Sequence, residues 1–467
     1  MEKFFKLKER NTTVRTEFFA GLTTFMAMAY ILMVNAGMFG DLGEGYYNAV
    51  YIATAISAVV GTILIGLLAN LPLAQASGMG LNAFFVYTVC FGLGFSYANA
   101  LVLVLFDGLL FIVLTITGLR KMIFEAIPKA VRGAISAGIG LFIAFLGMQN
   151  AGLIVNSDST LVDLHSFNLF MGNTTWPEIM PILVAVLSVF IIAILSKRKV
   201  KGAVLYGILG GSVIYYILGL ATVNGFYDAS VAPNLTADVF GPFKDFANLG
   251  FGKVFTEGFN FKPYIEANGT SNFIITAATT ALAFCMVDMF DTLGTLFGAC
   301  SVGGLVDEDG NIPNMDRAML ADAIATCTGA VCGTSTVTTF VESSAGVAEG
   351  GRTGLSSMFT ALFFFIALFL APVAAMIPGC ATAAALIYVG ILMIGGVKDI
   401  EWSDPCTAVP AFLTMTLMPF SYNISYGIAF GMISYIIIHL FTGKFREIKL
   451  GTWIIGALFA IMFFCSR

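Results

Sequence analysis

Apolar segments long enough to cross a lipid bilayer recur along almost the whole chain. Of its 467 residues, 58% are hydrophobic and 11% are charged, whereas a soluble domain carries roughly 25% charged residues. One aqueous core cannot bury this much apolar surface, so we expect an all-α polytopic membrane protein. Segment length and hydrophobicity predict about fourteen spanning helices. The predicted spans cover residues 17–38, 49–70, 80–95, 98–118, 131–154, 178–196, 202–221, 272–300, 317–333, 338–349, 354–377, 381–397, 406–421 and 424–441.

Charge and metal-binding residue types argue against several classes of function. The net charge is -5 and no region is strongly basic, so nucleic acid is not an expected partner. The eight cysteines are scattered through apolar runs without paired spacing, and His165 and His439 lie far apart. We therefore predict no metal site and no cofactor. An enzyme embedded in the membrane would need a metal set or a nucleophile–base pair, and neither is evident.

Lysine and arginine residues gather in segments that fall on one side of the membrane if the predicted spans are right. The side that carries such residues is cytoplasmic. We therefore expect a multi-pass protein of the cell membrane, in bacteria the inner membrane, with a cytoplasmic N-terminus. The basic residues are Lys3, Lys6, Lys8, Arg10 and Arg15, then Arg120, Lys121, Lys129 and Arg132, and those in 196–201 and 443–449.

The last apolar segment, 451–465, is short for a span, and the sequence leaves open whether it spans, lies at the interface or is soluble.

Two segments interrupt the apolar pattern with small and polar residues. They are NLPLAQASGMGLNAFFVYTV at 70–89 and GTSTVTTFVESSAGVAEGG at 333–351. In the second, about ten residues follow Thr339, which as a helix cover about 15 Å, half of a hydrocarbon core of about 30 Å. The β-branched run ahead of it favours extended chain. We predict short extended segments that lead into half-helices 3 and 10. Because these are the third spans of successive sets of seven, they predict two inverted 7-helix repeats with a midplane site.

Carboxyl groups within apolar segments are the main candidates for chemistry. VDMFDTLGT places Asp288 and Asp291 three residues apart on one helix face, and Glu342 begins the second half-helix. A carboxylate inside a membrane costs about 2.5 kcal/mol or more and indicates a functional site. The alternative is that such a residue only hydrogen-bonds helix ends. The proton-coupling carboxyl is Asp291, Asp288 or Glu342, and the sequence does not separate them.

The predicted pocket suits a neutral, planar ligand. The free N–H groups at a half-helix N-terminus would suit an anion, but Glu342 offsets their positive potential and no Lys or Arg accompanies it in the segment. Carboxylates accept ligand N–H groups, while backbone N–H groups donate to ligand oxygen or nitrogen. Asn82 in the other half-helix can do both, with a cap or a helix–helix hydrogen bond as its alternative role. Further candidates for lining the cavity are Thr24, Phe25, Phe84 and Thr339.

Four stretches resemble the AzgA-like purine permeases, the hypoxanthine/guanine/adenine branch of the nucleobase–cation symporters. They are TEFFAGLTTFMAMAYILMVNAGM, SGMGLNAFF, VDMFDTLGT and TSTVTTFVESSAGVAEGGRTGL. The similarity runs over about residues 5–440. It implies that Asp288 and Glu342 bind substrate, that Asn82 is functional, and that the backbone N–H of Val341 reaches the base. We therefore expect Asp288 to contact a purine and Asp291 to be a support or proton partner.

The resemblance also implies the organisation of the chain. Helices one to four and eight to eleven would form a core domain that moves like an elevator past a gate domain, and the gate would support a homodimer. Transport would be coupled to protons, with sodium as the other candidate ion. The predicted segments are 16–120 (core, first half), 121–222 (gate, first half), 223–270 (extracytoplasmic loop), 271–378 (core, second half), 379–442 (gate, second half) and 443–467 (C-terminal tail).

Together these arguments predict a secondary active importer of purine nucleobases, with guanine, hypoxanthine and adenine as candidates. The sequence does not indicate which purine is preferred. The alternative is an inorganic anion transporter of the same inverted-repeat fold. That alternative predicts a basic residue at the half-helix N-terminus, where this chain has Glu342.

Overall fold

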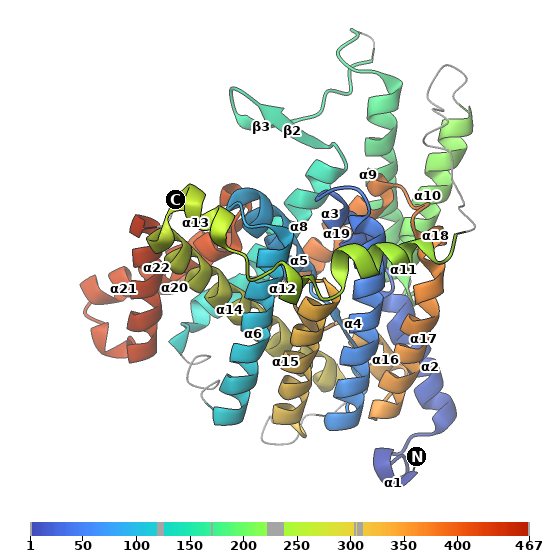
Figure 1. The fold of residues 1–467 in the computed structure, drawn as a ribbon, viewed down its shortest axis with the longest axis horizontal. Coiled ribbons are helices and arrows are strands. Elements are labelled where there is room, and N and C mark those ends of the chain that lie inside the picture. Colours follow the sequence, from blue (N-terminus) through green and yellow to red (C-terminus); the bar gives the residue numbers. More distant parts are fainter. Residues whose placement is uncertain are drawn as a thin grey trace.

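The computed structural model describes residues 2–118, 126–169, 171–221, 238–302, 305 and 312–465. Arg120 and Lys121, the predicted core–gate boundary between them, and residues 223–237 of the predicted loop lie outside the described residues. The described chain forms a bundle of roughly parallel helices, with a hairpin and several short helices toward one end (Figure 1).

One group of helices draws on both halves of the chain: α2 (Val14–Met28), α3 (Ile31–Gly40), α4 (Tyr46–Leu68), α6 (Tyr97–Thr117), α14 (Thr270–Val302), α15 (Met315–Cys332) and α17 (Gly354–Ala367). In this group α15 packs against α4 and α6, while α17 packs against α2 and α4. The first predicted span is broken between α2 and α3. Side-chain caps set two of the starts, because Thr13 accepts the N–H of Thr16 and Ser96 accepts that of Asn99.

A second group consists of α8 (Lys129–Asn150), α9 (Trp176–Lys197), α10 (Ala203–Ala221), α19 (Gly379–Met393), α20 (Pro405–Ser421) and α21 (Ile424–Phe441). Here α8 packs against α19 and α20, and α9 against α10 and α19. A capping box between Thr175 and Glu178 starts α9, and Asp404 caps α20. The described helices therefore pack as two groups that each contain segments from both halves of the sequence.

The two interrupted segments cross inside the first group. Strand β1 (Gln75–Ser77) leads into α5 (Met79–Ala83) and η1 (Phe84–Gly92), and strand β4 (Val337–Thr339) precedes α16 (Ser343–Ala348). The strands pair antiparallel, with Ala76 opposite Thr338. This confirms the predicted extended segments and half-helices. The second half-helix is shorter than the predicted 338–349, because the β-branched run stays extended and Gly350, at φ +107°, ends the helix.

Short elements lie around the bundle: α1 (Glu2–Phe5), the hairpin of β2 (Ile154–Ser157) and β3 (Leu161–Leu164), α11 (Gly241–Asp245), η2 (Phe246–Gly250), α12 (Lys253–Thr256), α13 (Lys262–Asn268), η3 (Leu368–Leu370), α18 (Ala371–Ala374), η4 (Ile394–Asp399), η5 (Phe445–Glu447) and α22 (Leu450–Cys465). The chain from α11 to α13 runs along α4, α6 and α14 (Figure 1). The C-terminal segment is helical, and α22 packs against α21 and α14, with Phe459 buried.

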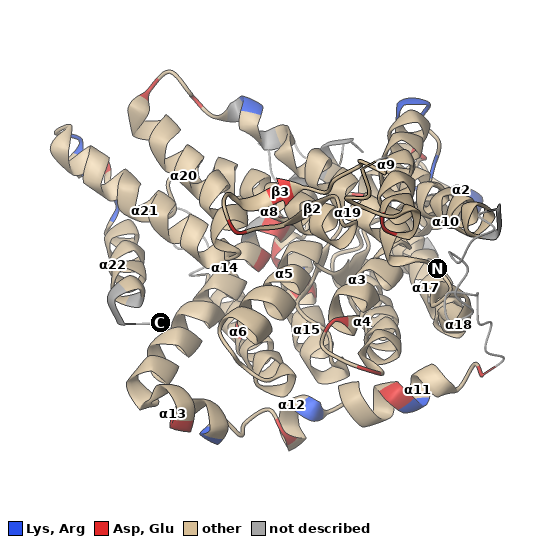
Figure 2. Ribbon diagram, turned by 90° about the horizontal axis from the view of Figure 1, so that it is seen from above, with Lys and Arg blue, Asp and Glu red and all other residues tan. Residues whose placement is uncertain are grey.

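Eight helices among the described residues are long and apolar enough to cross a membrane. Four shorter apolar helices accompany them, including Met79–Gly92 and Gly379–Met393. Figure 2 shows Lys and Arg around the outside of the bundle, whereas Asp and Glu also occur among the central helices. The prediction of an all-α, multi-pass membrane protein is confirmed.

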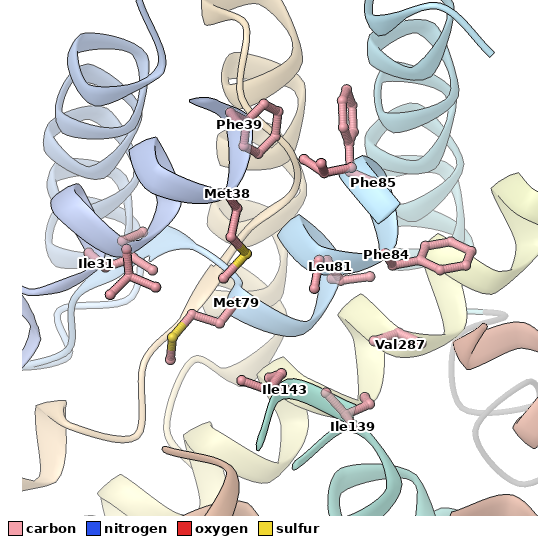
Figure 3. Close-up of a cluster of buried hydrophobic side chains, with 14 of the residues drawn as sticks. Ile31, Met38, Phe39, Met79, Leu81, Phe84, Phe85, Ile139, Ile143 and Val287 are labelled. Carbon is pink, nitrogen blue, oxygen red and sulfur yellow. The ribbon is translucent and has the colours of Figure 1, made fainter. Parts of the chain in front are cut away.

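An apolar seam joins the two groups at the first half-helix. Ile139 and Ile143 of α8 lie against α5, and Figure 3 shows them in one cluster with Met79 and Leu81. A Cβ atom at Gly80 would come within 2.5 Å of Ile139 Cγ2, so only glycine permits this approach.

The closest backbone approach in the first group joins α4 and α17. A Cβ atom at Gly354 would lie 2.0 Å from the carbonyl oxygen of Gly66. We expect Gly354→Ala to lower the free energy of unfolding by about 1–3 kcal/mol, because overpacking forces the backbones apart. Thermal unfolding in detergent measures this, with Gly37→Ala as the control, since nothing lies within 4 Å of that Cβ position. Equal stability of the two variants would contradict the proposed close packing.

Candidate functional site

The crossing of the strands brings the starts of the two half-helices together. Beyond the paired residues, the N–H of Gly78 donates to Thr336 O at 3.0 Å and that of Phe340 to Ala74 O at 3.0 Å. Gly78 precedes α5, and Glu342 stands at the same position before α16. The backbone N–H groups at the start of α5 therefore lie close to the crossing. In α16, by contrast, the N–H groups from Ser343 to Ala345 already donate to the carbonyl oxygens three residues earlier.

Glu342 is held from the first helix pair. The hydroxyl of Tyr30, at the break between α2 and α3, donates to Glu342 Oε1 at 2.6 Å, and Tyr30 is fully buried. Thr24 lies against the same half-helix, since a Cβ atom at Gly346 would come within 2.1 Å of its Oγ1. Val341, just before Glu342, is 46% exposed, so the described chain does not cover this end of the half-helix.

The two aspartates of α14 have different surroundings. Asp291 Oδ2 is 3.8 Å from the Cβ position of Gly78, and the Asp291 carboxyl lies within electrostatic range of Glu342. Asp288 is fully buried one turn earlier; Thr326 Oγ1 of α15 donates to its Oδ2 at 3.1 Å. Its Oδ1 has no hydrogen-bond partner among the described residues. Asp291 therefore faces the half-helix starts, while Asp288 faces α15.

Asn82 connects the half-helix to β1 and to the extended segment before β4. Its Oδ1 accepts hydrogen bonds from Ser77 Oγ, at 2.7 Å, and from Ser335 Oγ, and its Nδ2 donates to Ser77 O at 3.3 Å. These contacts join α5 to the extended segments and are neither a helix cap nor a helix–helix hydrogen bond. Its contact with a substrate stays a prediction.

Two further buried carboxyl groups were missed from the sequence. Asp322 of α15 accepts hydrogen bonds from Gln75 Nε2 at 3.0 Å, Thr292 Oγ1 at 2.8 Å and Thr339 Oγ1 at 3.3 Å. The hydroxyl of Thr339, a predicted lining residue, is thus already hydrogen-bonded within the protein, to Asp322. Asp107 of α6 is also fully buried. The signal was available, because each lies in an apolar run, where a carboxylate carries the same cost as at Asp288.

The two predicted aromatic residues pack within the protein. Phe84 meets Phe284 of α14 edge-on at 4.9 Å between ring centroids, and Phe25 meets Phe364 of α17 at 5.1 Å. Phe84 is 1% exposed. Stacking of either ring on a ligand stays a prediction.

A cavity of about 410 Å³ lies at the seam between the two groups of helices. It is formed by the end of η1 and by the turn between α20 and α21, and the hydroxyl of Thr88 donates to Tyr422 O at 2.8 Å across it. Its lining is mainly aromatic and polar: Tyr87, Thr88, Phe91, Gly92, Leu93, Ser421, Tyr422, Asn423 and Tyr426. Within the described ranges, no three His, Cys, Asp or Glu side chains come together so as to hold a metal ion.

Crossing half-helices with carboxyl groups at their starts, inside a multi-pass bundle, define a secondary transporter built from inverted repeats. The chain belongs to the Permease family, whose sequence pattern matches residues 15–430. The predicted membership of the xanthine and uracil permease group is thereby confirmed, and the chain is a transporter, not an enzyme.

Individual proteins are similar over nearly the whole chain. The adenine permease AdeP of Escherichia coli (strain K12) is 38% identical over 461 residues, which cover 99% of this chain and 95% of that protein. The guanine/hypoxanthine permease PbuO of Bacillus subtilis (strain 168) is 38% identical over 467 residues, covering 98% of each. The transmembrane domain of the cyanobacterial bicarbonate transporter BicA has a TM-score of 0.62 at 16% identity, covering 88% of this chain and 97% of that one. At that identity the likeness concerns the fold alone.

The bond from Tyr30 to Glu342 gives a test of the site. We expect Tyr30→Phe to lower the affinity for the transported substrate about ten- to a hundred-fold, because a hydrogen bond to a charged group contributes about 1.5–3 kcal/mol. Tyr51→Phe is the matched control, since Tyr51 is buried and its hydroxyl donates to Ala367 O at 3.0 Å, away from Glu342. Equal affinities of the two variants would show that the Tyr30 hydroxyl does not order the site.

Proposed function

We propose that this chain imports purine nucleobases across the cell membrane. The observation that carries the proposal is the pair of carboxyl groups, Glu342 and Asp291, at the starts of the two half-helices. Similarity of 38% along the full chain to an adenine permease and to a guanine/hypoxanthine permease supports it. Because both identities are equal, the comparison does not favour one purine.

The recognition chemistry follows from the donors and acceptors at the crossing. A purine edge carries N–H groups that carboxylates accept, and ring nitrogens or oxo groups that backbone N–H groups donate to. Glu342 supplies the first kind of contact, and the backbone N–H groups at the start of α5 supply the second.

We assign the second carboxyl contact to Asp291. The family resemblance implies Asp288, but Asp288 is fully buried against Thr326, whereas Asp291 is partly exposed beside Gly78. In this proposal Asp288 serves proton coupling. The two assignments predict opposite phenotypes and are tested below.

We further propose proton symport by an elevator movement of the first helix group past the second. Contacts that such a movement must break cross the seam near both ends of the bundle: Thr88 with Tyr422 O, and the ion pair of Lys201 with Glu349. The ion pair is weak, since it is half-exposed and screened by solvent, and the other contact is a single hydrogen bond. The proposal includes a cytoplasmic N-terminus, the bacterial inner membrane, the domain boundaries given above, and a homodimer through the second group.

The anion transporter is the second candidate, because the fold is shared with a bicarbonate transporter. A site for an anion requires net positive potential. Two carboxyl groups at the half-helix starts reverse that potential, which favours a neutral base. Sulfate or bicarbonate flux that purines do not inhibit would favour the anion transporter instead.

Radiolabelled purine uptake tests the assignment of carboxyl groups. In cells without their own purine permeases, we expect Glu342→Gln and Asp291→Asn each to weaken purine binding about ten- to a hundred-fold, since each loses a charge-assisted hydrogen bond. We expect Asp288→Asn to keep binding within about three-fold and to lose accumulation. Glu266→Gln on the exposed α13 is the control. Wild-type binding in Asp291→Asn with lost binding in Asp288→Asn would reverse the two roles.

A further inference from the structure

Asp107 is an acidic group that the purine site does not use. It lies in the middle of α6 and is fully buried, and apart from the weakly donating Cys285 thiol no described group hydrogen-bonds its carboxyl oxygens. A buried, unpartnered carboxylate is too costly to remain ionised in an apolar interior. Its side chain must therefore be neutralised, and the groups around it decide how.

The groups that face Asp107 come from α14 and α15. Cys285 and Asp288 of α14 lie beside its carboxyl, and Asp322 and Cys327 of α15 face it from the other side. The neighbouring Gly108 brings α15 close, because a Cβ atom there would meet Cys327 Sγ at 2.6 Å. The described groups that interact with Asp107 are thus acids and thiols, which cannot neutralise it as an ion pair would.

The other elements against α6 add charge only near its ends. Lys253 and Glu257 on and after α12 pair with each other, close to the start of α6, where Asn99 Nδ2 donates to Gly258 O at 2.7 Å. From η1 the titratable groups are Tyr87, whose hydroxyl donates to Asp41, and Cys90, which lies toward Tyr46 and Tyr97. A proton on Asp107 is the neutralising charge that this environment requires.

Asp107 is also connected to the purine site through neighbouring acids. Asp107 and Asp288 interact electrostatically, as do Asp288 and Asp291, and Asp291 and Glu342. Asp322 is next to Asp288 as well, but three donors stabilise its ionised form. Asp107, whose one donor is the weak Cys285 thiol, and Asp288, with one hydroxyl donor, have fewer hydrogen bonds than Asp322 to stabilise an ionised carboxylate.

We propose that Asp107 is a proton-binding residue of the coupling mechanism, located on α6 outside the purine site. It holds one proton in the conformation described here and passes it to the carboxylate of Asp288 during the transport cycle, so that Asp107 becomes ionised as Asp288 becomes neutral. The chemical class of its ligand is the proton, not a metal cation. This inference rests on the proposed purine transport.

Purified protein in proteoliposomes tests the inference. Asp107→Asn mimics the protonated side chain but cannot release a proton. We expect it to keep purine binding and purine–purine exchange within two-fold of wild type. Accumulation driven by an imposed pH gradient should fall at least ten-fold, as should proton entry per purine, measured with an internal pH dye. Asp107→Glu, which can still titrate, should restore accumulation at least in part and shift its pH profile. Cys285→Ala, which removes the neighbouring thiol alone, is the control and should couple normally.

Each other outcome contradicts the inference. Proton-driven accumulation at the wild-type level in Asp107→Asn would remove Asp107 from coupling. Loss of exchange together with accumulation would make Asp107 a structural residue. If Asp107→Asn does not fold, an unshifted pH profile in Asp107→Glu would have the same meaning. Wild-type uptake that requires sodium and ignores the pH gradient would replace the proton by a metal cation. Absence of any purine uptake or binding by the wild type would instead refute the proposed function, and so the two failures are distinguishable.

Discussion

The pairing of β1 with β4 is the interaction on which the site depends. A backbone that leaves the helical conformation inside a membrane exposes N–H and C=O groups that lipid cannot satisfy. Here the two extended segments satisfy each other, through the ladder from Gln75–Thr339 to Ser77–Val337. Because each strand is fixed by the other, the half-helix starts have defined positions. Glu342 and Asp291 meet there for that reason, although the chain separates them by many residues.

Threonine and serine side chains complete this crossing. Thr62 binds the backbone N–H and C=O of Gln75 in β1, and Ser357 donates to carbonyl oxygens of the segment before it. The Thr326 hydroxyl, which donates to Asp288, accepts the N–H of Val337 in β4. Small hydroxyl groups at the interface let backbones approach closely while hydrogen-bonding across helices. The polar composition that marked the interrupted segments in the sequence therefore stabilises the crossing itself, as Asn82 shows.

The sequence predicted the interrupted segments well because their composition conflicts with a continuous span. Glu342 was found for the same reason. The sequence alone could not predict which of the two aspartates, Asp288 or Asp291, faces the half-helix starts, since residues three apart differ by about 60° around a helix. That angle is small enough to suggest one shared face. In the structure, however, Asp288 is hydrogen-bonded to Thr326 of α15, whereas Asp291 lies beside Gly78 at the crossing. Asp107 and Asp322 were overlooked because no flanking polar residues drew attention to them, and only the tertiary structure brings them beside Asp288.

In the proposed proton symport, the acids would let substrate binding and proton binding influence each other. Four acids interact in successive pairs, with no described cation among them: Asp107 with Asp288, Asp288 with Asp291, and Asp291 with Glu342. In a medium of low dielectric constant, like charges at such positions strongly disfavour simultaneous ionisation. A base that donates hydrogen bonds to Glu342 and Asp291 favours their ionised forms, and this raises the proton affinity of Asp288 and Asp107. Substrate and proton then stabilise each other's binding, which is the thermodynamic requirement of symport. The coupling needs no direct contact between proton and purine, only that the acids remain close while the half-helices move together.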